Sequence, residues 1–262
     1  MCGISAVLLH PQDRAPSDWA AIRGAFTRNL LCNEERGREA TGCAVVGNDG
    51  RVLLLKKPVN ASRFAVTPEY HSLLDAIDSL TVLILGHTRL PTRGDPAFPS
   101  NNHPVEAGPV FGVHNGMVRN ADDLFVRSGL PRGAEVDSEI IFRLLATVVP
   151  ASSGAEYLSS VRPLICQLEG EFTFLACDRR RPDQLLVLKH ENPLSACFRE
   201  DWRALFFSSQ YLFLRKSFGE HIHAESLPDD RLLLFEAGRI PAAGLRPAAC
   251  LDLFEGTAGH GG

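Results

Sequence analysis

Apolar residues form short runs along the chain, separated by polar stretches that are rich in glycine and proline. Runs of strand length predict buried strands over residues 2–9, 41–47, 51–57, 81–87, 110–114, 172–177, 184–189, 203–208 and 231–236. Apolar residues that recur every three or four positions predict helices over 17–30, 69–78, 136–148 and 155–168. Strands and helices are mixed without strict alternation, which predicts an α+β domain.

Local signals set several boundaries. Ser17 is suited to cap the first helix. Asp49-Gly50 lies between two apolar runs and predicts a hairpin. The residues 88–108 carry four prolines and little periodicity, which predicts a long loop. Asn115-Gly116 is a turn pair and predicts the end of the strand before it, and Pro163 predicts a bend in the last helix.

Composition and charge exclude several classes of protein. The 262 residues carry a formal charge of −4 and only 8% aromatic residues, so nothing favours nucleic-acid binding. No apolar run approaches the roughly 20 residues of a membrane span, and no secretory signal is recognisable. The seven cysteines contain no C-x-x-C pair, which argues against a zinc site or a disulfide scaffold and predicts a cytoplasmic protein. We expect one domain over residues 1–254 and a flexible tail over 255–262.

Candidate chemistry begins at Cys2. Removal of Met1 would leave Cys2 with a thiol nucleophile and an α-amine whose ordinary pKa is about 7.7–8. Such an amine can accept a proton near neutral pH, so one residue could supply both nucleophile and base. The alternative is a small buried hydrophobe in a strand.

Three further sites lie near the ends of predicted elements. Arg89 could hold a carboxylate with both arms of its guanidinium, although most arginines simply lie on the surface. Asn115 and the Gly116 N–H could stabilise an oxyanion, and the alternative is an ordinary turn. Asp137 begins a predicted helix, where an acid commonly acts as a cap.

The order of these sites resembles the class II glutamine amidotransferases, whose glutaminase domains are N-terminal nucleophile hydrolases. The likeness covers about residues 2–240 and is greatest to the glutaminase domain of glucosamine-6-phosphate synthases. The motifs that carry it are Met1-Cys2-Gly3-Ile4, Arg36-Gly37-Arg38-Glu39-Ala40-Thr41-Gly42, His87-Thr88-Arg89 with Thr92 and Gly94, Asn101-Asn102-His103-Pro104, His114-Asn115-Gly116 and Asp137-Ser138-Glu139. Ser208-Ser209-Gln210 is more loosely similar to a motif that comes later in the family's sequences.

The resemblance implies a role for each matching residue. Cys2 would attack the amide and form a thioester, and Asn115 with the Gly116 N–H would hold the oxyanion. The binding residues would be Arg89 and Thr92 for the α-carboxylate, Asp137 for the α-ammonium, and His103 as a further substrate-binding residue. We expect no metal and no cofactor.

The resemblance also implies the fold, a four-layer α-β-β-α sandwich with two antiparallel sheets between helical layers. Cys2 should begin a central strand and face a cleft. Leu90 and Arg93 depart from the family pattern at positions of the loop that covers the site. We expect this departure to affect the covering loop and not the chemistry.

Three functions remain compatible with the sequence. The first is a stand-alone glutaminase subunit that supplies ammonia to a separately encoded synthase, because about 20 residues after the hydrolase fold are too few for an acceptor domain. The second is a hydrolase of another γ-glutamyl amide, and the third is a catalytically silent binding module. The expected partners are therefore glutamine or a γ-glutamyl amide and a synthase, with no nucleic acid and no membrane. Homo-oligomerisation is left open.

Overall fold

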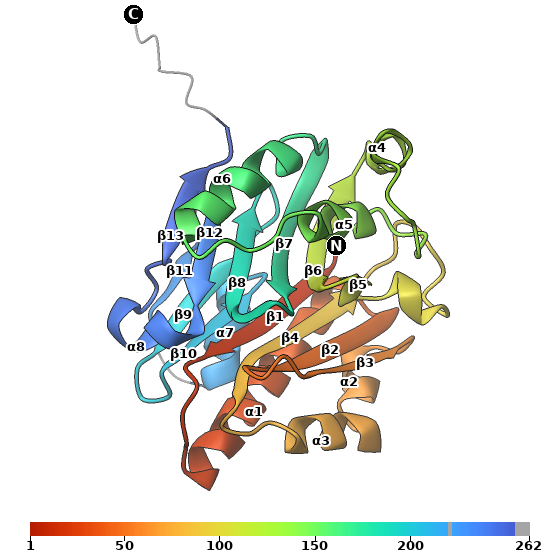
Figure 1. The fold of residues 1–262 in the computed structure, drawn as a ribbon. Coiled ribbons are helices and arrows are strands. Elements are labelled where there is room, and N and C mark those ends of the chain that lie inside the picture. Colours follow the sequence, from red (N-terminus) through yellow and green to blue (C-terminus); the bar gives the residue numbers. More distant parts are fainter. Residues whose placement is uncertain (220–221, 255–262) are drawn as a thin grey trace, which may run out of the picture.

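The computed structural model describes residues 1–219 and 222–254. Within them, two antiparallel sheets stack face to face and helices cover both outer faces, as the four-layer prediction required (Figure 1). The predicted tail over 255–262 lies outside the described residues, so the division into domain and tail stays a prediction. No helix in the described part of the chain is long and apolar enough to cross a membrane.

The first sheet has β1 at its centre, in the order β11-β9-β10-β1-β4-β2-β3. Its strands are β1 (Gly3–Leu9), β2 (Ala40–Gly47), β3 (Val52–Lys57), β4 (Thr81–Arg89), β9 (Ser195–Arg199), β10 (Ala204–Ser208) and β11 (Ala224–Ser226). The predicted hairpin is confirmed, since β2 and β3 pair antiparallel around Asp49-Gly50.

The second sheet follows the order β13-β12-β8-β7-β6-β5. Its strands are β5 (Val105–Ala107), β6 (Val110–Val118), β7 (Gly170–Asp178), β8 (Arg181–Lys189), β12 (Arg231–Glu236) and β13 (Ala249–Asp252). Three apolar clusters fill the spaces between the four layers, one between the sheets and one beneath each helical layer.

Helices complete the outer layers (Figure 1). They are α1 (Pro16–Asn33), α2 (Ala61–Phe64), α3 (Pro68–Asp75), α4 (Ala121–Ser128), α5 (Glu139–Ala146), α6 (Gly154–Ile165), α7 (Tyr211–Phe218) and α8 (Ile240–Ala243). The buried faces of α1 and α3 belong to the cluster beside the first sheet, and those of α5 and α6 to the cluster beside the second.

Several predicted boundaries were wrong. The first helix is capped at Ala15 and not by Ser17, because Pro16 already occupies its first turn. The predicted loop 88–108 contains a 3₁₀ turn at Pro99–Asn101 and the strand β5. The strand predicted over 110–114 continues through Asn115-Gly116 to Val118.

Besides β5, three further strands were not predicted, and neither were the helices α2, α4, α7 and α8. β9, β11 and β13 have only three to five residues each, and they gain stability from pairing with the strands beside them in the sheet. The helix α7 buries Phe213 and Leu214 against its surroundings, but two buried residues in so short a segment give little periodicity.

Candidate active site

The layer between the sheets is apolar through most of its depth and becomes polar at one end. Alternate residues of a strand face the same side, so every second residue enters this layer. Ile4 and Ala6 of β1 lie in its apolar part, and the same alternation places Cys2 on this side. On other strands, the alternate residues that face this layer end in buried polar residues: His87, Arg89, Asn115, Thr173 and Ser209. Both sheets therefore contribute side chains to the polar end.

Cys2 directly precedes the central strand and lines a cavity of about 250 Å³. Met1, Leu90, Thr92 and Gly116 line the same cavity. The Leu90 N–H donates to Cys2 Sγ at 3.4 Å, and the Leu90 carbonyl lies 3.5 Å from this sulfur as an acceptor for the thiol. The structure thus brings together Cys2, Thr92 and Gly116 of the predicted site residues.

The Cys2 thiol is half-buried, and burial raises its pKa above the ordinary value. The Leu90 N–H, the positive N-terminus and the cations Arg89 and Arg36 oppose this rise. Arg36 also fixes the backbone, since its Nε donates to the Cys2 carbonyl at 2.6 Å. A raised pKa keeps the thiol protonated at neutral pH, so a nucleophilic attack by this sulfur would need a base.

Asn115 is fully buried and is tied to β1, the strand that follows Cys2. Its Nδ2 donates to Ser209 Oγ at 2.9 Å, and the same oxygen accepts the Ile4 N–H at 2.7 Å. The Ser209 N–H in turn donates to the Ile4 carbonyl at 3.0 Å. An amide nitrogen carries two hydrogens, and the bond to Ser209 occupies one of them. Asn115 is not among the residues that line the cavity at Cys2.

Gly116 is held within β6 and does not form a turn. Its φ of +127° lies in a region that favours glycine, and a Cβ at this position would stand 1.8 Å from the Glu171 carbonyl oxygen. Glycine at position 116 therefore lets β7 approach closely, and the Asn115-Gly116 pair does not reverse the chain.

Arg89 and Asp137 are buried, and both already form hydrogen bonds with other groups of the protein. Arg89 Nη1 donates to Asn102 Oδ1 at 2.8 Å, and its Nη2 donates to the carbonyls of Arg93 and Gly94 at 2.5 and 2.8 Å. Asp137 Oδ2 accepts the Val118 N–H at 2.6 Å. Neither residue lines the cavity at Cys2, although the charge on Arg89 interacts with both Cys2 and Asp137.

His103 also lies away from the cavity lining, in a buried cluster with His87 and His114. The rings of His87 and His103 are 4.1 Å apart, and that of His114 is 6.4 Å from His103. Burial lowers the pKa of all three rings, to about 3 for His87. Both nitrogens of His103 lack a partner among the described residues. The cluster is therefore neutral at physiological pH, and His103 does not face the space beside Cys2.

Arg93 fastens the covering segment, which we define as residues 90–98, to α4. Arg93 Nη1 lies 2.9 and 2.8 Å from the two carboxylate oxygens of Asp122 on α4, and Arg132 Nη1 lies 2.6 Å from the first of them. Such exposed ion pairs contribute about 1 kcal/mol or less each. This network is the structural consequence of having arginine at position 93.

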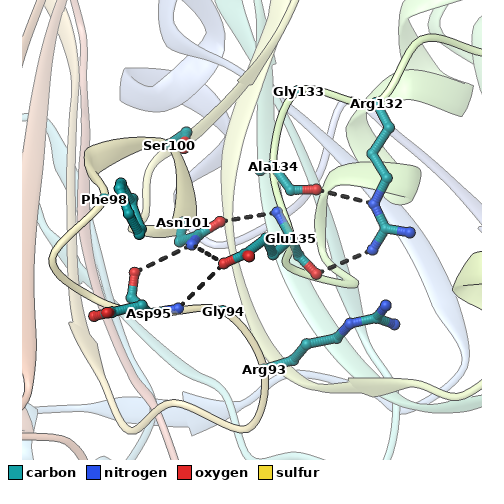
Figure 2. A pocket seen from close by; sticks show the side chains of 10 residues that line it. All are labelled: Arg93, Gly94, Asp95, Phe98, Ser100, Asn101, Arg132, Gly133, Ala134 and Glu135. Atoms are coloured by element: carbon teal, nitrogen blue, oxygen red, sulfur yellow. Dashed lines mark hydrogen bonds between the residues drawn. The ribbon is translucent and has the colours of Figure 1, made fainter.

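A second cavity of about 750 Å³ lies beside the covering segment (Figure 2). The side chain of Asn101 exchanges hydrogen bonds with Glu135 in its wall: Asn101 Nδ2 donates to Glu135 Oε2 at 2.7 Å, and the Glu135 N–H donates to Asn101 Oδ1 at 2.8 Å. Cys2 does not line this larger cavity. The smaller cavity is therefore the candidate active site.

The sequence did not assign roles to Ser209, Arg36 or Asn192. Ser209 and Arg36 lie in recognised motifs, but their bonds to Asn115 and Cys2 depend on the pairing of distant strands. Asn192 follows β8 and lines the cavity at Cys2, and no signal in the sequence indicated it.

Glutamine–fructose-6-phosphate aminotransferases are among the curated proteins that this chain is similar to. The chain is 26% identical over 201 residues to the probable glutamine–fructose-6-phosphate aminotransferase (isomerizing) of Schizosaccharomyces pombe, which covers 74% of this chain and 28% of the relative. It is 28% identical over 200 residues to the enzyme of that name from Vibrio vulnificus, covering 74% and 29%. The chain thus spans less than a third of the length of these curated relatives. No family model matches it.

Solved structures share the fold. A glutamine phosphoribosylpyrophosphate amidotransferase from B. subtilis superposes with a TM-score of 0.66 and 17% identity, over 90% of this chain and 47% of that one. A glutamine aminotransferase class-II domain protein from Silicibacter pomeroyi gives a TM-score of 0.56 and 16% identity, over 97% of this chain and all of that one. These likenesses establish the architecture.

Proposed function

Because the chain contains a class II glutamine amidotransferase domain, we propose that it hydrolyses glutamine, or another γ-glutamyl amide, through a thioester on Cys2. The observation that carries this proposal is the position of Cys2 at the cavity beside Gly116, with Asn115 tied through Ser209 to β1. A nucleophile and a donor for the oxyanion are two of the groups that amide cleavage needs, and a base for the thiol is the third.

Removal of Met1 supplies the base in this proposal. The Met1 side chain is 69% exposed, so its loss uncovers little of the core. The freed α-amine of Cys2 takes the thiol proton, and the thiolate attacks the amide carbon. The oxyanion that forms accepts hydrogen bonds from Asn115 Nδ2 and the Gly116 N–H. The amine then returns the proton to the leaving nitrogen, and water cleaves the thioester to give glutamate.

The charged end of the substrate would bind beneath the covering segment. Arg89 now donates to carbonyls of that segment, and a substrate carboxylate would take the place of these weaker acceptors. Asp137 would accept the α-ammonium beside it. Holding both charges orients the side-chain amide toward Cys2, and this positioning lowers the barrier.

Ammonia released from glutamine would go to a separate synthase partner. The name of the curated relatives specifies fructose 6-phosphate as their acceptor, and this chain matches less than a third of their length. In this proposal the separate partner binds the acceptor of the ammonia.

Intact-mass spectrometry and a glutamate-release assay test the proposal on the purified protein. We expect an active preparation to begin at Cys2 and to release glutamate from glutamine. Cys2→Ser should abolish turnover, whereas Cys250→Ser, which changes an exposed cysteine on β13, should not. Retention of Met1 in an active preparation would refute the mechanism, and absence of hydrolysis would favour the silent binding module.

A further inference from the structure

The leaving group of glutamine, ammonia, needs little room in the cavity at Cys2. Ammonia is about the size of a water molecule, whose share of liquid volume is about 30 Å³. The cavity has a volume of about 250 Å³ and extends past Gly116 to Met117, Arg119, Glu171 and Asn192. The proposed mechanism gives none of these four residues a role.

Strand pairing places Arg119 and Glu171 on one face. Met117 lies opposite Glu171 in the β6–β7 ladder, and the Arg119 N–H donates to the Glu169 carbonyl at 2.7 Å, which continues the pairing beyond β6. Arg119 is two residues after Met117, so it lies diagonally across from Glu171, at a typical Cβ separation of about 7–8 Å. Both are on the side that carries Asn115 and Thr173, the side that faces Cys2.

The two charges are available for a ligand. Both side chains are exposed, and within the described part of the chain neither the guanidinium of Arg119 nor the carboxylate of Glu171 has an ion-pair partner or a hydrogen bond. At this spacing, the charges of Arg119 and Glu171 leave room between them for a ligand group that carries one negative and one positive charge.

Asn192 provides an independent observation. Its side chain is only 4% exposed, and its Nδ2 is buried with no acceptor among the described residues. This nitrogen would be 3.0 Å from a Cβ on Gly116, and the Asn192 carbonyl accepts a hydrogen bond from Thr173 Oγ1 at 2.8 Å. A buried donor without an acceptor is unfavourable, so a substrate oxygen in this cavity would stabilise the loop that carries Asn192.

We propose that Arg119, Glu171 and Asn192 form a subsite for the leaving group of a γ-glutamyl amide whose nitrogen carries a carboxylate-bearing substituent, as in a γ-glutamyl amino acid. This proposal rests on the proposed function. Arg119 binds the substituent's carboxylate, Asn192 donates to an oxygen of the same group, and Glu171 faces the nitrogen that becomes an ammonium.

The reaction balances without a further reactant. The Cys2 sulfur forms a bond to the γ-carbonyl carbon, the carbon–nitrogen bond breaks, and the nitrogen leaves as an amine with the thiol proton. Water then cleaves the thioester to glutamate and regenerates the thiol. Glu171 stabilises the positive charge when the released amine takes a further proton from solvent.

Steady-state kinetics of the full chain on two substrates test the subsite. γ-Glutamylglycine presents the carboxylate, and γ-glutamylmethylamide has the same amide without it. We expect kcat/KM to be about tenfold or more higher for γ-glutamylglycine, because charged hydrogen bonds of this kind give such factors. Arg119→Gln should remove most of this preference. Arg127→Gln alters an exposed arginine of α4 outside this cavity and should preserve the preference.

A second variant tests the buried donor. Asn192→Asp keeps the shape of the side chain and replaces its donor with an acceptor, so it should also lower the ratio of kcat/KM between the two substrates. Equal kcat/KM values in the wild type, or an unchanged ratio in Arg119→Gln, would overturn the subsite while glutamate release keeps the proposed function intact. If neither γ-glutamyl amide nor glutamine is hydrolysed, the proposed function fails and the subsite fails with it.

Discussion

Acidification should destabilise the protein through its buried histidines. Burial lowers the pKa of His87 to about 3, whereas an unfolded histidine titrates near pH 6.5. Between these values the unfolded chain binds a proton that the folded chain does not. The free energy of unfolding is therefore highest above pH 6.5 and falls as the pH decreases toward 3.

The size of the effect follows from the two pKa values. At pH 5 the difference from the unfolded pKa is 1.5 units, which corresponds to about 2 kcal/mol for His87 at about 1.4 kcal/mol per unit. The pKa of His103 and that of His114 are lowered by burial as well, so both rings act in the same direction. Domains are commonly stable by about 5–15 kcal/mol, and a loss from one ring alone is therefore measurable.

Urea unfolding at pH 7.5 and pH 5.0, followed by circular dichroism, measures this loss. His87→Gln removes one titrating ring. Between the two pH values, the free energy of unfolding of this variant should therefore fall by about 2 kcal/mol less than that of the wild type. His71→Gln changes an exposed histidine on α3 and serves as the control. If His87→Gln and His71→Gln show the same pH dependence as the wild type, the assignment of acid sensitivity to the buried cluster is wrong.

Two further predictions concern the proposed site. Arg89→Lys keeps the charge but loses the two-armed geometry, so KM for glutamine should rise about tenfold or more, whereas Asn115→Ala should lower kcat by about 10²–10³ with little change in KM. Steady-state kinetics distinguish the two effects. The reverse pattern would show that the two roles are misassigned. Ser209→Ala leaves the Ile4 N–H without its 2.7 Å acceptor, so it should lower the free energy of unfolding by about 1–3 kcal/mol and should also lower kcat. An unchanged kcat would show that Ser209 does not orient Asn115.

The fold class follows from local patterns, because runs of strand length and helical periodicity are visible in the sequence. The stacking of two sheets came from the family resemblance, and the pairing confirms it. The Asn115-Gly116 pair was misread, since the same residues that favour a turn also permit the close approach of Glu171. The bond between Asn115 and Ser209 spans 94 residues and depends on how the sheets stack, so no local pattern contains it.

Alternation along β6 limits how this protein can change over evolution. Phe111 and Val113 build the core from the same face that carries Asn115. Inserting one residue between Val113 and His114 would turn Asn115 toward the outer helices and bring His114 inward, while Phe111 and Val113 keep their places in the core. A change of length in this strand thus disrupts the site unless a β-bulge absorbs it. Length changes are tolerated in the exposed covering segment, so new substrate preferences can arise through insertions there and through substitutions at exposed positions such as Arg119.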